Sequence, residues 1–199
     1  MKKPALTAAL LVLMANPAFS ASVSLTYSYF KIDGVSLDEI ERQLQRRGPQ
    51  VASTGSRHPG ATRLEFETKL TYRQRGSFCS VAEARVAVKA NMILPRWTRP
   101  RGADRETRLI WETLAADIKR HEQSHVVIAR NHARDMETSL ADLTNFRGCD
   151  AAKEAAQNTS DHLLRQHDKA QAQFDRVEGI NFEKRILGLL QRRLERTTR

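Results

Sequence analysis

The first half of the chain alternates apolar and polar side chains with a period of two, which is typical of β-strands buried on one face. Residues 23–29 form the first alternating run, and Gly34 ends it. Residues 64–72 and 86–94 repeat the pattern, with a turn expected at Arg75-Gly76-Ser77 near the end of the second run. These three runs predict a small antiparallel sheet.

A short helix is expected between the first and second runs. Ser36 and Glu39 are spaced as in a capping box, which marks the start of a helix. Ile40 and Leu44 then fall on one helical face, and Gly48-Pro49 ends the helix.

Beyond Pro100 the period changes to that of an α-helix. Residues 104–143 contain neither glycine nor proline, and one stripe recurs at spacings of three and four. The stripe consists of Leu114, Ile118, His121, His125, Ile128, His132, Met136 and Leu140. After a break at Gly148, a second helix is expected from about Ala151 and packs antiparallel to the first, because the connection is short. The predicted fold class is therefore α+β: a small antiparallel sheet packed on a long helix and on a second, antiparallel C-terminal helix.

Residues 1–20 have the pattern of a bacterial secretory signal peptide. Lys2 and Lys3 precede an apolar stretch, and Ala18-Phe19-Ser20 has the small-x-small form of a cleavage site. The apolar stretch is shorter than the roughly 20 residues that span a bilayer. We therefore expect a periplasmic or secreted protein without integral membrane association, in which residues 21–199 form a single domain.

The net charge is positive and spread along the chain. Removing the two lysines of residues 1–20 lowers the formal charge from +10 to +8. The densest positive run lies near the C-terminus, at Arg185, Arg192, Arg193, Arg196 and Arg199. We interpret this run as a solvated basic helical tail and expect no nucleic-acid partner; attraction to nucleic acid or to an anionic envelope surface is the less favoured alternative.

The chain contains two cysteines, Cys79 and Cys149. Because an exported protein folds in an oxidising compartment, we expect a disulfide between them. Free thiols or zinc ligands are the alternative, but neither cysteine has the close partner of a Cys-x-x-Cys site.

The long helix carries a candidate zinc site in the sequence RHEQSHVV, residues 120–127. His121 and His125 are one turn apart on the apolar stripe, where two imidazoles can bind one metal ion. Glu122 lies about 100° away around the helix, beside the ligands, as a general base must. The competing interpretation is a pair of satisfied interior histidines. His132 lies about 10 Å farther along the helix axis, too far to share the ion.

The third ligand must come from another segment. In an antiparallel helix pair with its break near residue 147, His125 faces residue 169 and His121 faces residue 173, within about one turn. We predict Glu178 as the third ligand, with Asp175 either as a partner that hydrogen-bonds to a ligand or as the alternative ligand. His167 and Asp168 are also in reach, and a solvated acidic helix end is the competing interpretation.

The chain resembles the bacterial predicted secreted zinc-dependent proteases, otherwise known as a domain of unknown function. The resemblance lies in Gly48-Pro49, His58-Pro59-Gly60-Ala61-Thr62, Cys79, Leu94-Pro95-Arg96-Trp97, Trp111 and residues 121–125. It implies a zincin-like metallopeptidase domain that binds Zn²⁺ through His121 and His125 and uses Glu122 as catalytic base. Members of that family carry a late Tyr-Asp followed by His-Gly, whereas residues 174–179 of this chain contain no histidine.

Two functions follow as expectations. The first is an exported zinc metallopeptidase that hydrolyses peptides or proteins of the bacterial envelope, with the substrate aligned along an edge strand at residues 84–94. The second is a non-catalytic envelope protein that keeps a degenerate or structural metal site and binds a partner.

Overall fold

A computed structural model describes residues 21–51, 55–98 and 101–197, so the expected signal peptide at residues 1–20 lies outside the described residues. The chain is α+β, as the change of period predicts. Its elements, in order, are β1 (Ser22–Ile32), α1 (Leu37–Arg47), β2 (Gln50–Val51), β3 (Ser56–Arg57), β4 (Ala61–Arg75), β5 (Phe78–Trp97), α2 (Arg105–Ala141), β6 (Phe146–Arg147) and α3 (Cys149–Thr197).

The main sheet has the strand order β1-β5-β4, and the short β6 pairs with the beginning of β5. β4 and β5 form an antiparallel hairpin whose turn contains Gly76 at a φ of 60°, as expected from the sequence. β1 runs parallel to β5, from Ser22 beside Ala87 to Ile32 beside Trp97. The sheet is therefore mixed, and the expected all-antiparallel sheet is wrong. A period of two shows which side chains are buried, but it carries no information on the direction of the neighbouring strand.

The position of β5 corrects a second expectation. Residues 84–94 were predicted to be an edge strand, but β5 lies between β1 and β4 and is hydrogen-bonded on both sides. Among the strands of the described residues, β1 and β4 form the two edges of the main sheet.

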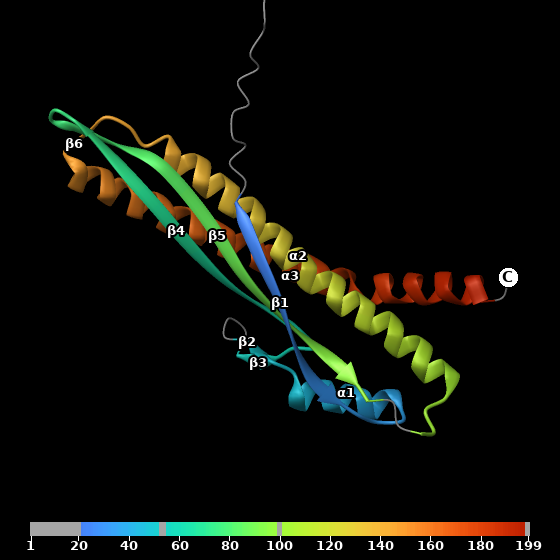
Figure 1. Cartoon of the computed structure of the whole chain (residues 1–199). Helices are drawn as coiled ribbons and strands as arrows, with labels where there is room; N and C mark the ends of the chain where they lie inside the picture. The colour runs from blue at the N-terminus through green and yellow to red at the C-terminus, as the bar shows by residue number, and fades with distance from the viewer. Residues whose placement is uncertain (1–20, 52–54, 99–100, 198–199) are drawn as a thin grey trace, which may run out of the picture.

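The helices α2 and α3 are antiparallel and lie on one face of the sheet (Figure 1). Val86 and Val88 of β5 are buried there against Ala133 and Met136 of α2, and Leu163 of α3 completes this core. The outer face of the sheet is polar, with Thr26 and Asn91 hydrogen-bonded to each other across β1 and β5. Burial of one face explains the alternation along all three strands.

A second core forms where α1 meets the ends of β1, β5 and α2. Ile40 and Leu44 of α1 pack with Trp97 and Trp111, whose rings lie 5.9 Å apart. Ser36 caps α1 with the predicted reciprocal bonds to Glu39. Packing of α1 at this end places the loop before β4 beside the middle of α2.

The predicted disulfide is confirmed: Cys79 and Cys149 are bonded, with Cα atoms 4.9 Å apart. The bond joins the first residues of β5 to the first residue of α3, next to the antiparallel pairing of β5 with β6. Among the residues that the structure describes, no helix combines the length and the apolar character needed to cross a membrane.

Candidate metal centre

Three potential ligand atoms from α2 and α3 form a nearly equilateral triangle. His121 Nε2 and His125 Nε2 of α2 lie 3.1 Å apart. Asp175 Oδ1 of α3 lies 3.3 Å from His121 Nε2 and 3.0 Å from His125 Nε2. Within the described residues, these three form the group of His, Cys, Asp or Glu side chains whose ligand atoms converge closely enough to hold a metal ion.

The triangle has the size that a tetrahedral Zn²⁺ site requires. Ligand atoms at about 2.0–2.1 Å from the ion in tetrahedral geometry are separated by about 3.4 Å. The observed separations of 3.0–3.3 Å are close to this value without any movement of the backbone. Two imidazoles and one carboxylate are also a ligand set that zinc accepts, and three protein ligands leave the fourth coordination position open.

Phe174 holds the two imidazole rings in place. Its ring stacks on His121 at a centroid distance of 4.9 Å and meets His125 edge-on at 5.1 Å. Because Phe174 and Asp175 are adjacent on α3, the same turn supplies both the packing surface and the carboxylate. Ring contacts of this kind restrict the rotamers that would turn the Nε2 atoms away from each other.

Gln171 is the outer partner of His125. Its Oε1 lies 2.5 Å from His125 Nδ1, and its Nε2 donates to the backbone oxygen of His125 and lies 2.8 Å from His167 Nε2. With the amide oxygen as acceptor, His125 donates from Nδ1, which leaves Nε2 as the ring atom that would bind an ion in the triangle. Sequence reasoning missed Gln171, although it lies four residues before Asp175 and hence on the same helical face.

The charge state of His125 depends on its neighbours. Burial alone lowers the pKa of His125, but hydrogen bonds with Asp175 and Gln171 outweigh burial and raise it. The pKa of Asp175 is strongly lowered, because its bonds with His121 and His125 outweigh its partial burial. An ion that binds here must therefore displace a proton from the histidine pair.

Glu178, the predicted third ligand, lies outside the triangle. Its Oε2 is 3.6 Å from His121 Nδ1, on the side of the ring that faces away from Asp175. Its carboxylate is paired with Arg120 and lies 3.4 Å from Arg185. Burial would raise the pKa of Glu178, but the bond from Arg120 outweighs it and lowers the pKa. The structure thus brings Asp175, which was the alternative third ligand, together with both histidines.

Asp117 anchors these arginines one turn before His121. Its side chain is almost fully buried, and Arg185 donates to it from Nε at 3.0 Å and from Nη2 at 3.2 Å. Arg120 Nε donates to the same carboxylate at 2.9 Å. Burial opposes the charge of Asp117, but the bonds from Arg185 and Arg120 lower its pKa. This network fastens α3 to α2 beside the histidines.

Glu122 is almost completely buried, with 4% of its surface exposed. The hydroxyl of Thr62, at the start of β4, lies 2.8 Å from its Oε2 and 3.1 Å from its backbone oxygen. Burial raises the pKa of Glu122, while the bond from Thr62 works in the opposite direction. A buried carboxylate with a raised pKa beside two histidines is suited to accept a proton.

Gly60 allows the loop before β4 to approach Glu122. A Cβ atom at Gly60 would lie 2.9 Å from Glu122 Oε1 and 2.8 Å from Ile118 Cγ2, too close for either atom. Gly60 and Thr62 belong to the stretch that carries the family resemblance, but periodicity gives them no role, because the contact joins segments about 60 residues apart.

These residues line an open cleft of about 260 Å³. His121, Glu122, Asp175 and Glu178 form one side, and residues 58–60 form the other. His132 lies elsewhere, with its ring 5.6 Å from that of His167, as the helical spacing predicts.

The comparisons with known proteins give one finding. No curated protein and no solved structure matches the chain. A family model described as a bacterial protein of unknown function (DUF922) matches residues 27–183, which include His121, Glu122, His125, Asp175 and Glu178. Since the match extends over more than half of the chain, the protein belongs to the DUF922 family of bacterial proteins of unknown function.

Proposed function

We propose that this protein is an exported, zincin-like zinc metallopeptidase that hydrolyses peptide bonds in envelope peptides or proteins. The observation that carries the proposal is the triangle of His121, His125 and Asp175 beside the buried carboxylate of Glu122. A structural metal site needs only ligands, whereas a hydrolytic site also needs an open position and a base.

His121, His125 and Asp175 would hold the ion, and Gln171 and Glu178 would orient the two imidazoles from their Nδ1 atoms. Zn²⁺ bound there would polarise the scissile carbonyl and lower the pKa of a coordinated water.

Glu122 would move the proton. Its raised pKa makes it a stronger base than an exposed glutamate, and the hydroxyl of Thr62 holds one of its oxygens. In this mechanism Glu122 takes a proton from the attacking water and passes it to the nitrogen of the leaving amine.

The first residues of β4 can align an extended substrate. Gly60, which lines the cleft, directly precedes β4, and Thr62 of β4 donates to Glu122. β4 pairs with β5 on one side, and within the described residues no strand pairs with its other edge. A peptide added along this edge would bring its backbone beside the cleft. We therefore assign to β4 the substrate-aligning role expected for residues 84–94.

The proposal also includes export. The disulfide between Cys79 and Cys149 is the kind of bond that persists in oxidising compartments outside the cytosol. It agrees with the signal-peptide pattern of residues 1–20.

The first test compares the wild type with Glu122→Gln. Residues 21–199 are purified, dialysed, analysed for metals by mass spectrometry and incubated with a mixture of peptides. We expect about one zinc per chain in both proteins, and hydrolysis that falls at least about 100-fold in Glu122→Gln, because general-base catalysis contributes on that order. Equal hydrolysis by the two proteins contradicts the proposed mechanism, and absence of zinc after reconstitution contradicts the metal site.

A second test separates Asp175 from Glu178. We expect Asp175→Ala to lower zinc affinity more than 100-fold, since it removes a ligand, and Glu178→Ala to lower it by about 10-fold, as loss of an outer partner does. Competition with a chromogenic chelator measures both affinities. A larger loss in Glu178→Ala would restore Glu178 as the ligand.

A non-catalytic, partner-binding protein is the second candidate, and one observation favours it. Ile180, Leu187 and Leu194 are spaced by seven residues on α3 and are all exposed. α3 extends beyond the sheet at this end (Figure 1). Zinc binding without hydrolysis in either the wild type or Glu122→Gln would favour this function.

A further inference from the structure

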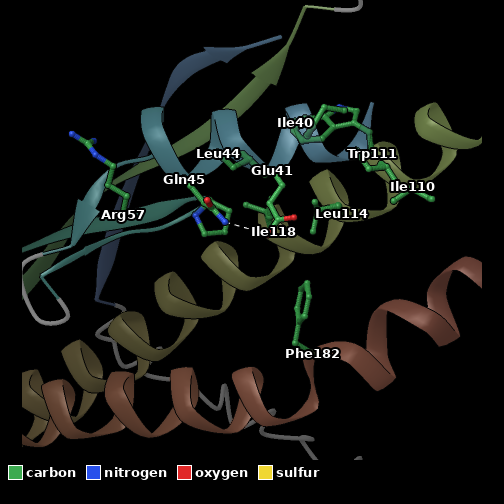
Figure 2. A pocket seen from close by; sticks show the side chains of 12 residues that line it. Ile40, Glu41, Leu44, Gln45, Arg57, Ile110, Trp111, Leu114, Ile118 and Phe182 are labelled. Carbon is green, nitrogen blue, oxygen red and sulfur yellow. Dashed lines mark hydrogen bonds between the residues drawn. The ribbon is translucent and has the colours of Figure 1, made fainter. Parts of the chain in front are cut away.

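An apolar pocket of about 450 Å³ lies between α1, α2 and α3 (Figure 2). Ile40 and Leu44 of α1 form one wall, and Trp111, Leu114 and Ile118 of α2 form another. Phe182 projects from α3 toward the face of α2 that carries Leu114 and Ile118 (Figure 2). The volume lies in the range of about 300–1,000 Å³ that is usual for ligand pockets.

This apolar pocket adjoins the candidate metal cleft. Pro59, Ile118 and Phe182 line both cavities. Ile118 lies one helical turn before His121, so its side chain separates the apolar floor from the ligand triangle. A substrate bound in the cleft therefore has the apolar pocket beside its reacting bond.

The walls of the pocket favour an apolar group over a charged one, because most of the residues that line them are apolar. Its polar residues, Glu41, Gln45 and Arg57, are exposed, and Gln45 donates to Glu41 while Arg57 donates to the backbone oxygen of Gly48. Phe182 is 44% exposed, so an apolar ring faces open space. A large apolar side chain would gain the free energy of leaving water, whereas a carboxylate would lose hydration beside a lining whose cation, Arg57, is exposed and already donates to Gly48.

We propose that this pocket is the substrate subsite that receives a large apolar side chain, such as that of Phe or Leu, next to the cleaved peptide bond. The inference rests on the proposed function for the identity of the occupant. It adds the class of substrate: extended peptides with a bulky apolar residue close to the scissile bond.

Binding of peptides without turnover tests the subsite. Blocked pentapeptides Gly-Gly-X-Gly-Gly, with X as Phe, Leu, Ala or Asp, are titrated into Glu122→Gln in the presence of zinc. Because Trp111 lines the pocket, its fluorescence reports occupancy. We expect the Phe and Leu peptides to bind at least about 10-fold more tightly than the Ala and Asp peptides, on the order of one buried apolar side chain.

Phe182→Ala and Phe78→Ala in the same background form a matched pair. Both phenylalanines are about half exposed, at 44% and 47%, but Phe78 lies in the β4–β5 hairpin away from the pocket. We expect Phe182→Ala to remove the preference for Phe and Leu, and Phe78→Ala to keep it.

Three results would overturn the proposed subsite. They are equal affinity for all four peptides, no binding of any peptide, or the same loss of the preference for Phe and Leu in both variants. A dimer that Phe182→Ala dissociates would assign the pocket to a second copy of the chain and would also overturn it. If the wild type hydrolyses peptides without any preference at X, the subsite fails while the peptidase stands. If the Phe peptide binds as expected but the wild type with zinc does not hydrolyse it, the peptidase fails while the subsite stands.

Discussion

A single hydroxyl group limits the rise in the pKa of the proposed base, Glu122. Burial raises the pKa of Glu122, and the hydrogen bond from Thr62 stabilises the ionised carboxylate and so limits that rise. Burial thus sets the direction of the pKa shift of Glu122, and the hydrogen bond from Thr62 reduces its size.

Thr62→Val should therefore change the pH dependence of hydrolysis. Loss of the donor raises the pKa of Glu122 further, so the acid limb of the kcat/KM profile moves to higher pH and activity below neutral pH falls. Zinc content should stay the same, because Thr62 contacts none of the proposed ligands. The profile is compared with that of Thr71→Val, which changes an exposed threonine of β4. Identical profiles for the two variants would show that Thr62 does not set the pKa of Glu122.

The proposed ligands illustrate what sequence reasoning can reach at the scale of residues. His121 and His125 lie one turn apart on α2, so the distance between them follows from helical geometry alone. Asp175 and Glu178 share a face of α3, and periodicity cannot choose between them. The structure separates them because Arg120 and Arg185 bind Glu178, whereas Asp175 faces both histidines.

At the scale of elements, the metal triangle requires α2 and α3 to keep one relative register. His125 contacts Gln171 and His121 contacts Asp175, close to the predicted partners at residues 169 and 173. Antiparallel packing across a short connection is the reason why that prediction succeeds. The bonds from Arg185 of α3 to Asp117 of α2 hold the same register one helical turn before His121.

Asp117→Asn should destabilise the protein by roughly 3 kcal/mol at pH 7. This is the low end of the range for breaking a buried ion pair, because both arginines are partly exposed. The pKa of Asp117 is lowered by folding, so its charge contributes fully above the usual value of 3.8 and contributes less as the pH falls below it. The difference in stability between wild type and Asp117→Asn should shrink below about pH 4.

Denaturant unfolding at several pH values measures this difference. Asp150→Asn is the matched control, because Asp150 is fully exposed and pairs with Lys153 at 3.1 Å within α3. Its effect should be much smaller than that of Asp117→Asn, because exposed ion pairs contribute little. A loss in Asp117→Asn that is as small as in the control, or that does not vary with pH, would show that the network does not hold the two helices together.

The sheet shows where pattern reasoning stops at this scale. The capping box at Ser36 and the glycine turn at Gly76 are local, and both are confirmed. The parallel pairing of β1 with β5 is not local, since the whole of α1 and β4 lies between the two strands in the chain. Alternation along β5 is the same for a central strand as for an edge strand, so the expected edge at residues 84–94 had no signal against it.

In the whole molecule, the disulfide and the apolar pocket lie at different ends, with the candidate metal site between them. The disulfide joins the hairpin end of the sheet to the start of α3, near β6, while α1 lies toward the opposite end (Figure 1). The apolar pocket is lined in part by residues of α1. The metal triangle lies between them, where α2 and α3 pack. Folding stability and substrate binding should therefore respond separately to changes at the two ends.

Breaking the disulfide should lower stability without loosening the metal site. Cys79 and Cys149 are 70 residues apart, and closing a loop of that size contributes about 4 kcal/mol in the chain-entropy model. We expect Cys79→Ala/Cys149→Ala to unfold at a lower denaturant concentration by a corresponding amount, measured by circular dichroism. The folded variant should keep the zinc affinity of the wild type, because Gln171, Phe174 and Asp175 contact α2 independently of the bond. A variant of unchanged stability would show that core packing and the β6 pairing hold α3 to the sheet without the bond. A weakened zinc site in the folded variant would show that the disulfide also sets the register of the two helices.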